Sequence, residues 1–257
     1  MKYIDIHAHL DFKEFDGERE NIIAQMKGKG IGSINIGTSL ESSQNSIALS
    51  ETHDNLWAIV GVHPLHTNDS VLSDINLIEP LVSHQRCVGI GECGLDFFRE
   101  ADDMETKARQ LSFFEKQIEL AIDHNKPLMI HCRKAYPETI EVLNSYRKSH
   151  PELHAHFHFF TESIETARII LDMGFTVSFT GVITFVQEYE DLVRFVPLDS
   201  MMAETDSPYV APKSVRGTRN DPTNVIEIVQ KIADIRSRTL EDVASQIRQN
   251  TTRIFKI

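Results

Sequence analysis

The run YIDIH at residues 3–7 decides the fold class, because it opens a series of eight short segments of strand length that are rich in β-branched and apolar residues. The other seven are IGSINIG (31–37), LWAIVGV (56–62), CVGIGE (87–92), PLMIHC (127–132), LHAHFHF (153–159), FTVSF (175–179) and SMMAET (200–205). Longer segments separate them. This alternation is typical of proteins in which parallel strands are joined by helices.

Three of the intervening segments carry clear helical patterns. In 104–125 apolar residues recur on one stripe, and Asp102 and Asp103 precede them as N-cap candidates. Segment 162–173 repeats the pattern, and Gly174 is placed to end that helix. The last helix is expected to begin after Thr239. The inward positions are Leu111, Phe114, Ile118, Ala121 and Ile122 in the first helix, Ile164, Ala167 and Leu171 in the second, and Leu240, Val243, Ala244, Ile247, Thr251 and Ile254 in the last.

Eight strands that each precede a helix, with no linker between them, predict one parallel α/β domain over residues 1–257. A closed (β/α)8 TIM barrel fits both the strand pattern and the chain length. A doubly wound open sheet is the alternative. It is disfavoured because no Gly-rich phosphate-binding motif follows the first strand.

Composition narrows the class of partner. A formal net charge of −12 excludes broad, non-specific coating of nucleic acid or of an anionic membrane. The three cysteines, Cys87, Cys93 and Cys132, lie unpatterned in apolar runs and indicate reduced thiols rather than a disulfide framework. No apolar run approaches the ~18 residues of a membrane span, and the start of the chain lacks a signal-peptide core. We expect a soluble, cytoplasmic protein.

Histidine and carboxylate residues gather where the predicted strands end. These residues are His7 and His9 after the first strand, His63 and His66 after the third, Glu92 after the fourth, His131 after the fifth, the triplet His154, His156 and His158 in the sixth, and Glu204 and Asp206 after the eighth. Each alone has an ordinary explanation as a hydrogen-bonded structural residue or a helix cap. Together they indicate a metal site, because the carboxyl ends of barrel strands meet on one face.

The types of donor atom limit which metals the site could bind. Imidazole and carboxylate without thiolate favour Zn²⁺, Mn²⁺, Mg²⁺ or Fe²⁺ in a hydrolytic site. In the HxH pair His7 and His9, both side chains point the same way along a strand and can reach one ion. In the triplet only the last histidine meets the active face, so His158 is the predicted ligand. His156 is expected to pack inside the barrel and His154 to be structural.

Six segments of the sequence resemble, in order, the signature segments of the TatD family of metal-dependent hydrolases. They are DIHAHLDFKEFDGER, GVHPLH, GIGECGLDFFR, MIHCRKA, HFFTESIETARIILDMGFTVSFTGVITF and ETDSPYVAP with RGTRNDP. The resemblance implies a (β/α)8 barrel of the amidohydrolase type with one or two divalent metals, Zn²⁺, Mg²⁺ or Mn²⁺. It also implies nuclease activity, in most members that of a DNase and often of a 3′–5′ exonuclease.

Carried over position by position, the resemblance implies two metal positions. His7, His9 and Asp206 would hold one ion, His131 and His158 the second, and Glu92 would bridge them. The chain departs from the family at Phe159, where a cysteine is usual, which changes packing beside the ligand but not ligation. It also departs at Leu65, an extra residue between Pro64 and His66, so His63 is the better match for the family histidine.

The remaining roles complete the predicted site. Asp206 is the expected general base, and His63 would steady a phosphate oxygen or protonate the leaving group. Glu204 is expected to orient the site rather than to ligate. The predicted substrate-binding cations are Arg99, Arg133, Arg216 and Arg219, with Lys213 nearby. Phe97, Phe98 and Tyr209 are candidates for base stacking or for wall packing.

We therefore expect a monomeric metal-dependent phosphodiesterase that acts on single-stranded DNA, with RNA as a further substrate, through a water activated by two metals. A second hypothesis keeps the metals and changes the bond, to deacylation of a misacylated tRNA. Broader amidohydrolase chemistry is disfavoured because Glu92 stands where a bridging carbamylated lysine would be needed. A catalytically idle metal-binding barrel is disfavoured by the complete ligand set.

Overall fold

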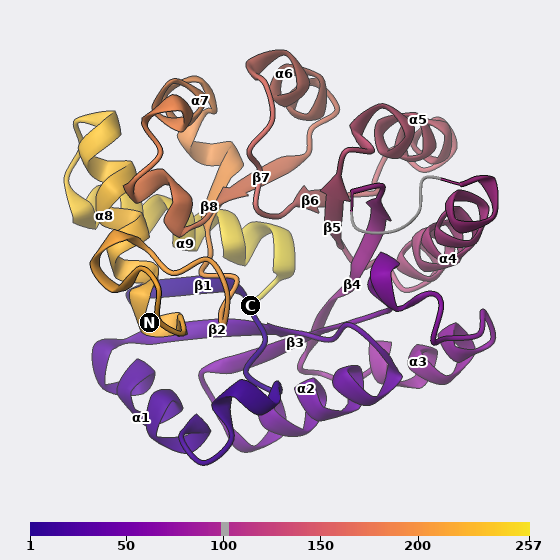
Figure 1. The fold of residues 1–257 in the computed structure, drawn as a ribbon, viewed down its shortest axis with the longest axis horizontal. Helices are drawn as coiled ribbons and strands as arrows, with labels where there is room; N and C mark the ends of the chain where they lie inside the picture. Colours follow the sequence, from indigo (N-terminus) through magenta and orange to yellow (C-terminus); the bar gives the residue numbers. More distant parts are fainter. Residues whose placement is uncertain (99–102) are drawn as a thin grey trace.

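The computed structural model describes residues 1–98 and 103–257. Its centre is one sheet of parallel strands that pair in sequence order, which Figure 1 shows as a ring of arrows inside a ring of helices. The strands are β1 (Tyr3–Ala8), β2 (Ile31–Ile36), β3 (Leu56–Val60), β4 (Cys87–Asp96), β5 (Leu128–Arg133), β6 (Ala155–Phe157), β7 (Thr176–Phe179) and β8 (Met201–Ala203). The predicted eight-stranded barrel is confirmed.

Helices cover the outside of the sheet. They are α1 (Arg19–Lys29), α2 (Leu40–Thr52), α3 (Asp74–Val82), α4 (Met104–Asp123), α5 (Tyr136–Arg147), α6 (Ile164–Asp172), α7 (Glu190–Phe195), α8 (Val225–Arg236) and α9 (Leu240–Phe255). In the part of the chain that the structure describes, no helix is both long and apolar enough to cross a membrane.

Residues after β8, rather than β8 alone, close the barrel against β1. Ala8 and Ser207 form an isolated parallel bridge, and the backbone N–H of His9 donates to the carbonyl of Ser207 at 2.9 Å. Below them the Asp5 carboxylate accepts hydrogen bonds from the backbone N–H and the hydroxyl of Thr205, at 2.9 and 2.5 Å. This seam brings residues 205–207 beside the first strand.

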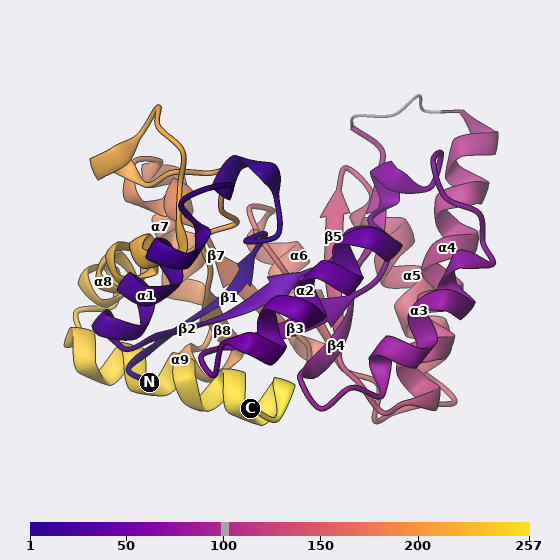
Figure 2. The ribbon, with the colours of Figure 1, turned by 90° about the horizontal axis from the view of Figure 1, so that it is seen from below.

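Two apolar clusters stabilise the barrel. The larger one fills the space between strands and helices. The smaller one lies inside the barrel, where Ile4, Ile6, Met129 and Met202 of the strands meet Phe255 of α9. In Figure 2 α9 runs beneath the strands, so it closes the amino-terminal end of the barrel and leaves the carboxyl-terminal end for the site.

The expected helix starts agree with the structure. Asp103 and Thr239 cap α4 and α9, each accepting a hydrogen bond from a backbone N–H in the first turn. Ser163 caps α6, and Gly174 follows that helix with a φ of 74°, the left-handed conformation that favours glycine. Asp102, the other predicted cap, lies outside the described residues.

Three strands differ most from the prediction. β4 continues four residues past Glu92 to Asp96, because pairing with β5 resumes from Cys93 to Asp96 after a register shift. β6 and β8 are shorter than predicted, at 3 residues each. β6 ends at Phe157, and the chain cannot continue as a strand through Phe159, whose φ of 45° is incompatible with extended backbone. Glu92 therefore lies within a strand and His158 lies just beyond one.

Candidate metal centre

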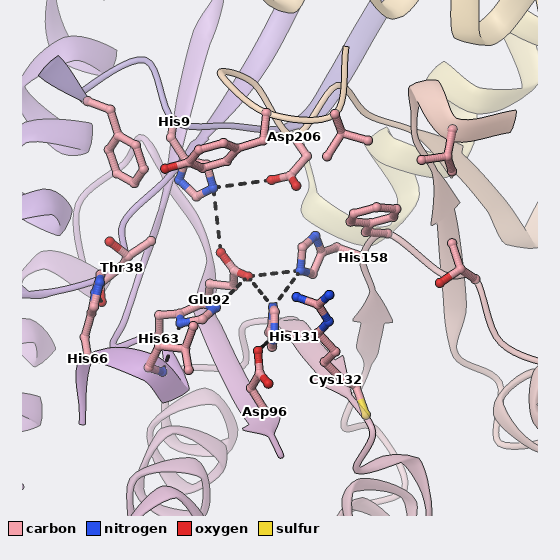
Figure 3. A pocket seen from close by; sticks show the side chains of 18 of the residues that line it. His9, Thr38, His63, His66, Glu92, Asp96, His131, Cys132, His158 and Asp206 are labelled. Carbon is pink, nitrogen blue, oxygen red and sulfur yellow. Dashed lines mark hydrogen bonds and ion pairs between the residues drawn. The ribbon is translucent and has the colours of Figure 1, made fainter. Parts of the chain in front are cut away.

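A cavity of about 620 Å³ opens at the carboxyl ends of the strands. Figure 3 shows imidazoles and carboxylates pointing into it from different strands. Polar residues of the lining are His9, Thr38, His63, His66, Glu92, Asp96, His131, Arg133, His158, Thr161 and Asp206, and the aromatic residues are Phe12, Phe159, Tyr189 and Tyr209. The convergence predicted from the strand ends is present.

His7, His9 and Asp206 form the first group of possible ligands. The Nε2 atoms of His7 and His9 are 3.2 Å apart, and Asp206 Oδ1 lies 3.7 and 3.6 Å from them. Asp206 reaches this position because its backbone is left-handed, with a φ of 53°, and its N–H donates to the carbonyl of His7 at 2.9 Å. The contact between β1 and residues 205–207 therefore brings these three side chains together.

Glu92 lies between this group and a second one. Its Oε2 is 3.3 Å from His7 Nε2, while its Oε1 is 2.9 Å from His131 Nδ1 and 3.0 Å from His158 Nε2. The register shift within β4 turns this side chain into the cavity. One carboxylate therefore presents a different oxygen to each group.

His131 and His158 form the second group, with Nδ1 of the first and Nε2 of the second 3.2 Å apart. Their outer nitrogens face carboxylates: His131 Nε2 is 3.0 Å from Asp96 Oδ2, and His158 Nδ1 is 3.5 Å from Glu204 Oε1. Glu204 is buried and held by the N–H of Phe159 and the hydroxyl of Ser178. This arrangement of carboxylate, imidazole and metal-facing nitrogen is common around protein metal sites.

The distances between the imidazole nitrogens of each group are suitable for binding a divalent metal ion. Two nitrogens that share one ion at ~2.0–2.1 Å in tetrahedral geometry stand about 3.3 Å apart, close to the separation in both groups. The possible ligand atoms within each of three sets lie within 4.8 Å of one another: His7, Glu92 and His158; His7, His9 and Asp206; and His63, Glu92 and His131. The donor set of imidazole and carboxylate fits the metals expected from the sequence.

His63 differs from the other imidazoles although it also approaches Glu92. Its Nδ1 accepts a hydrogen bond from the backbone N–H of Leu65 at 3.0 Å, so the neutral ring carries its proton on Nε2. That Nε2 lies 3.3 Å from Glu92 Oε1 and donates toward it. With its proton on Nε2, His63 is better suited to donate a hydrogen bond into the cavity than to bind a metal.

Burial and neighbouring charges set the protonation of the site. Burial opposes the charged form of His9, but the interaction with Asp206 and the charge of Glu92 outweigh it and raise its pKa to about 9. The pKa of His158 is raised well above its ordinary value in the same way, by Glu92 and Glu204. Burial dominates at His63 and lowers its pKa to about 4. The pKa of Glu92 lies well below its usual range because the surrounding imidazoles outweigh its burial.

Comparison with known proteins identifies the family. Residues 4–256 match the family model described as TatD related DNase. The chain belongs to the TatD family. It is 32% identical to the uncharacterized metal-dependent hydrolase YabD of Bacillus subtilis over 98% of both chains. It is 31% identical to the 3′-5′ ssDNA/RNA exonuclease TatD of Pantoea ananatis, again over 98% of both.

Solved structures show the same fold. The TatD homologue YjjV from Escherichia coli superimposes with a TM-score of 0.90 at 24% identity and covers 100% of this chain, which covers 98% of that one. An organophosphorus hydrolase mutant superimposes with a TM-score of 0.65 at 13% identity, covering 98% of this chain and 92% of its own. These structures share the barrel fold of this chain. Its membership of the TatD family and its curated relatives make the chain a metal-dependent hydrolase.

In this TatD protein the predicted cations divide into separate groups. Arg133 lines the cavity, with its guanidinium 3.9 Å from the centre of the Phe98 ring. Arg216 and Arg219 do not line it: Arg216 lies over Phe185, and Arg219 donates to the backbone of Glu14 and pairs with Glu18. Arg99 lies outside the described residues.

The other predicted residues lie as follows. Tyr209 lines the TatD cavity with about half its surface exposed, beside Phe12, whereas Phe97 packs against the core. His156 is buried inside the barrel between the hydroxyls of Thr176 and Ser178, each at 2.8 Å. His154 lies 3.3 Å from the Thr176 hydroxyl and is not part of the cavity lining.

Sequence reasoning missed Asp96 and Phe12. Asp96 was hidden because the fourth strand was expected to end at Glu92, yet an acidic residue that closes an apolar strand run is itself the signal used for the other strand ends. Phe12 stacks on His9 with ring centres 4.6 Å apart. No spacing rule connects an aromatic residue three positions later to that imidazole.

Proposed function

We propose that this TatD protein is a divalent-metal-dependent phosphodiesterase that shortens single-stranded DNA or RNA. The observation that carries the proposal is Glu92, whose two oxygens face two separate groups of possible ligands. His7, His9 and Asp206 would hold one cation, His131 and His158 the other, and Glu92 would contact both. Cations held there would supply the Lewis acidity that phosphodiester hydrolysis requires.

The side chains around this centre suit the remaining steps. Asp206, whose pKa is lowered because its imidazole neighbours outweigh its burial, would accept the proton of the attacking water. As that water bonds to phosphorus, the bond to the leaving oxygen breaks, and this oxygen takes up a proton from solvent. His63 would donate a hydrogen bond from Nε2 to that oxygen as a neutral ring, since its pKa of about 4 keeps it uncharged at neutral pH.

Substrate recognition would depend on few cations. Arg133 is the one arginine or lysine that lines the cavity within residues 1–98 and 103–257, and it would contact a phosphate next to the scissile one. Tyr209 and Phe12 form an aromatic wall on which an unpaired base could stack. Such a site suits the end of a flexible strand better than a duplex, which needs a broad cationic surface. The printed name of the Pantoea ananatis relative supports the same substrate class.

The deciding experiment is a substrate panel on one purified preparation loaded in turn with Mg²⁺, Mn²⁺ and Zn²⁺. Single-stranded DNA and RNA labelled at either end, duplex DNA and an aminoacyl-tRNA ester are offered in parallel. We expect progressive shortening of single strands from the 3′ end and its loss on chelation. Cleavage of the aminoacyl ester with every nucleic acid left intact would establish the deacylase alternative instead.

A further inference from the structure

Asp96 is a buried carboxylate that the proposed reaction does not use. It is 1% exposed and ends β4, the strand that also carries Glu92. Its Oδ2 lies 3.0 Å from Nε2 of His131, on the side of the imidazole that faces away from Glu92. Figure 3 shows Asp96 behind His131 as seen from the cavity centre. It therefore contacts a possible ligand and not the metal position.

Asp96 is fixed in this orientation by several hydrogen bonds. Its Oδ1 accepts the backbone N–H of Phe98 at 2.8 Å. Gln110 of α4 holds its backbone from both sides: Oε1 accepts the N–H of Asp96 at 2.9 Å, and Nε2 donates to its carbonyl at 3.1 Å. Gln110 is itself fully buried. Turning the carboxylate would break its contacts with Phe98 and His131, while Gln110 keeps the backbone that carries it in place.

We propose that Asp96 is a positioning residue that selects Nδ1 of His131 as its metal-binding nitrogen. An ionised carboxylate only accepts hydrogen bonds, so it favours a proton on His131 Nε2. The lone pair of Nδ1 then points to the place shared with Glu92 Oε1 and His158 Nε2, at 2.9 and 3.2 Å. The inference rests on the proposed function in one respect, namely that the second group of ligands binds metal.

Replacement of Asp96 by asparagine gives a sharp test because Phe98 decides how the amide is oriented. The N–H of Phe98 requires the amide oxygen at the Oδ1 position, which puts the NH₂ group opposite His131 Nε2. Two donors cannot face each other, so the imidazole is driven to carry its proton on Nδ1, where it blocks metal binding. Asp96→Ala removes the partner without forcing either tautomer.

The experiment compares Asp96→Asn, Asp96→Ala and wild type, with Asp103→Asn at the exposed N-cap of α4 as the matched control. Zinc affinity is measured by competition with a chromophoric chelator, and folding by circular dichroism. We expect affinity at His131 and His158 to fall about tenfold in Asp96→Ala and about a hundredfold in Asp96→Asn, with Asp103→Asn unchanged. A role in packing alone predicts the opposite order, with alanine the worse replacement, and a role in charge alone predicts equal losses in the two variants.

Nitrogen-15 spectra of the histidine rings in the zinc-loaded wild type give a second readout that does not depend on any variant folding. We expect a protonated Nε2 and a metal-shifted Nδ1 for His131, and the reverse would overturn the proposal. So would equal zinc affinity in Asp96→Asn and wild type. If wild type itself binds no zinc, the proposed metal centre fails, a result distinct from either of these.

Discussion

His7 Nε2 and His9 Nε2 lie 3.2 Å apart at the end of one strand. Nδ1 of His9 lies 3.0 Å from the carbonyl of Ile36, to which it donates, so in the neutral ring Nε2 presents a lone pair to its neighbour. Two buried nitrogens held this close need a cation or a proton between them. The pair therefore couples the stability of the fold to occupation of the site.

Chelation is the first test of that coupling. Removal of metal should lower the thermal midpoint by about 5–10 °C relative to protein held at a hundredfold excess over the dissociation constant, since such binding contributes about 2.7 kcal/mol. Scanning calorimetry with and without added Zn²⁺ measures the shift. The control is Asp206→Asn. Its thermal midpoint should fall less on chelation, because the group formed by His7, His9 and residue 206 has lost a negative charge. An unchanged midpoint in wild type would show that the site holds no metal.

Metal binding should release protons in a pH-dependent way. The pKa of His9 is raised to about 9, and that of His158 is also raised, because Glu92 and the neighbouring acids outweigh their burial. At pH 7 both imidazoles of the metal-free protein carry a proton that the metal must displace. Apparent affinity should therefore rise with pH through about pH 9, where His9 loses its proton. Calorimetric titration in buffers of different ionisation enthalpy counts the protons, and a count of zero would contradict the prediction.

Asp206→Asn should abolish hydrolysis, by about a thousandfold or more, and leave the fold intact. Asparagine tolerates the left-handed backbone at this position, and the N–H that donates to the carbonyl of His7 is retained. The amide cannot accept a proton from water. Turnover of a labelled single strand and circular dichroism are measured together. The exposed Asp199→Asn serves as control, and turnover retained in Asp206→Asn would remove this residue as the base.

Replacement of single histidines of the triplet should separate ligand from scaffold. His158→Ala should lose nearly all activity, because its Nε2 faces Glu92 and His131. His154→Ala should lose little, because that ring lies away from the cavity lining. Initial rates at saturating metal compare the two variants. Equal losses would mean that the ligand assignment in the sixth strand is wrong.

Arg133 and Arg219 form a matched pair of arginines with different surroundings. Arg133→Ala should raise KM for single-stranded substrates by about ten- to hundredfold, the worth of one hydrogen bond to a charged group. Arg219→Ala should leave KM unchanged, since that side chain is committed to Glu14 and Glu18 on the surface. Steady-state kinetics on one oligonucleotide decides this. A raised KM in Arg219→Ala alone would relocate the substrate path.

The sequence predicted the barrel and most of the imidazoles and carboxylates in the cavity, because strand ends in such a fold converge whatever the details of packing. His7, His131 and His158 could be chosen by period and position alone. Asp96 was missed because the strand was expected to end at Glu92, and the irregularity that extends β4 to Asp96 arises from its pairing with β5. The proton position on His63 depends on one backbone N–H from the turn that follows it.

The other differences from the prediction arise from contacts with residues that are distant in the sequence. Arg219 was expected to face substrate, yet it pairs with Glu18, 201 residues earlier in the chain. Proximity of a cation to the site along the chain says nothing about which acid lies opposite it in space. Arg133 differs because β5 itself ends at this residue, two positions after His131, so the strand carries it to the cavity.

The seam between β1 and residues 205–207 also sets the order of events during synthesis. His7 and His9 leave the ribosome before Asp206, which completes their group and follows only after all eight strands have been made. A growing or truncated chain that ends before this point lacks that group's carboxylate. This group of possible ligands is therefore incomplete until the barrel can close.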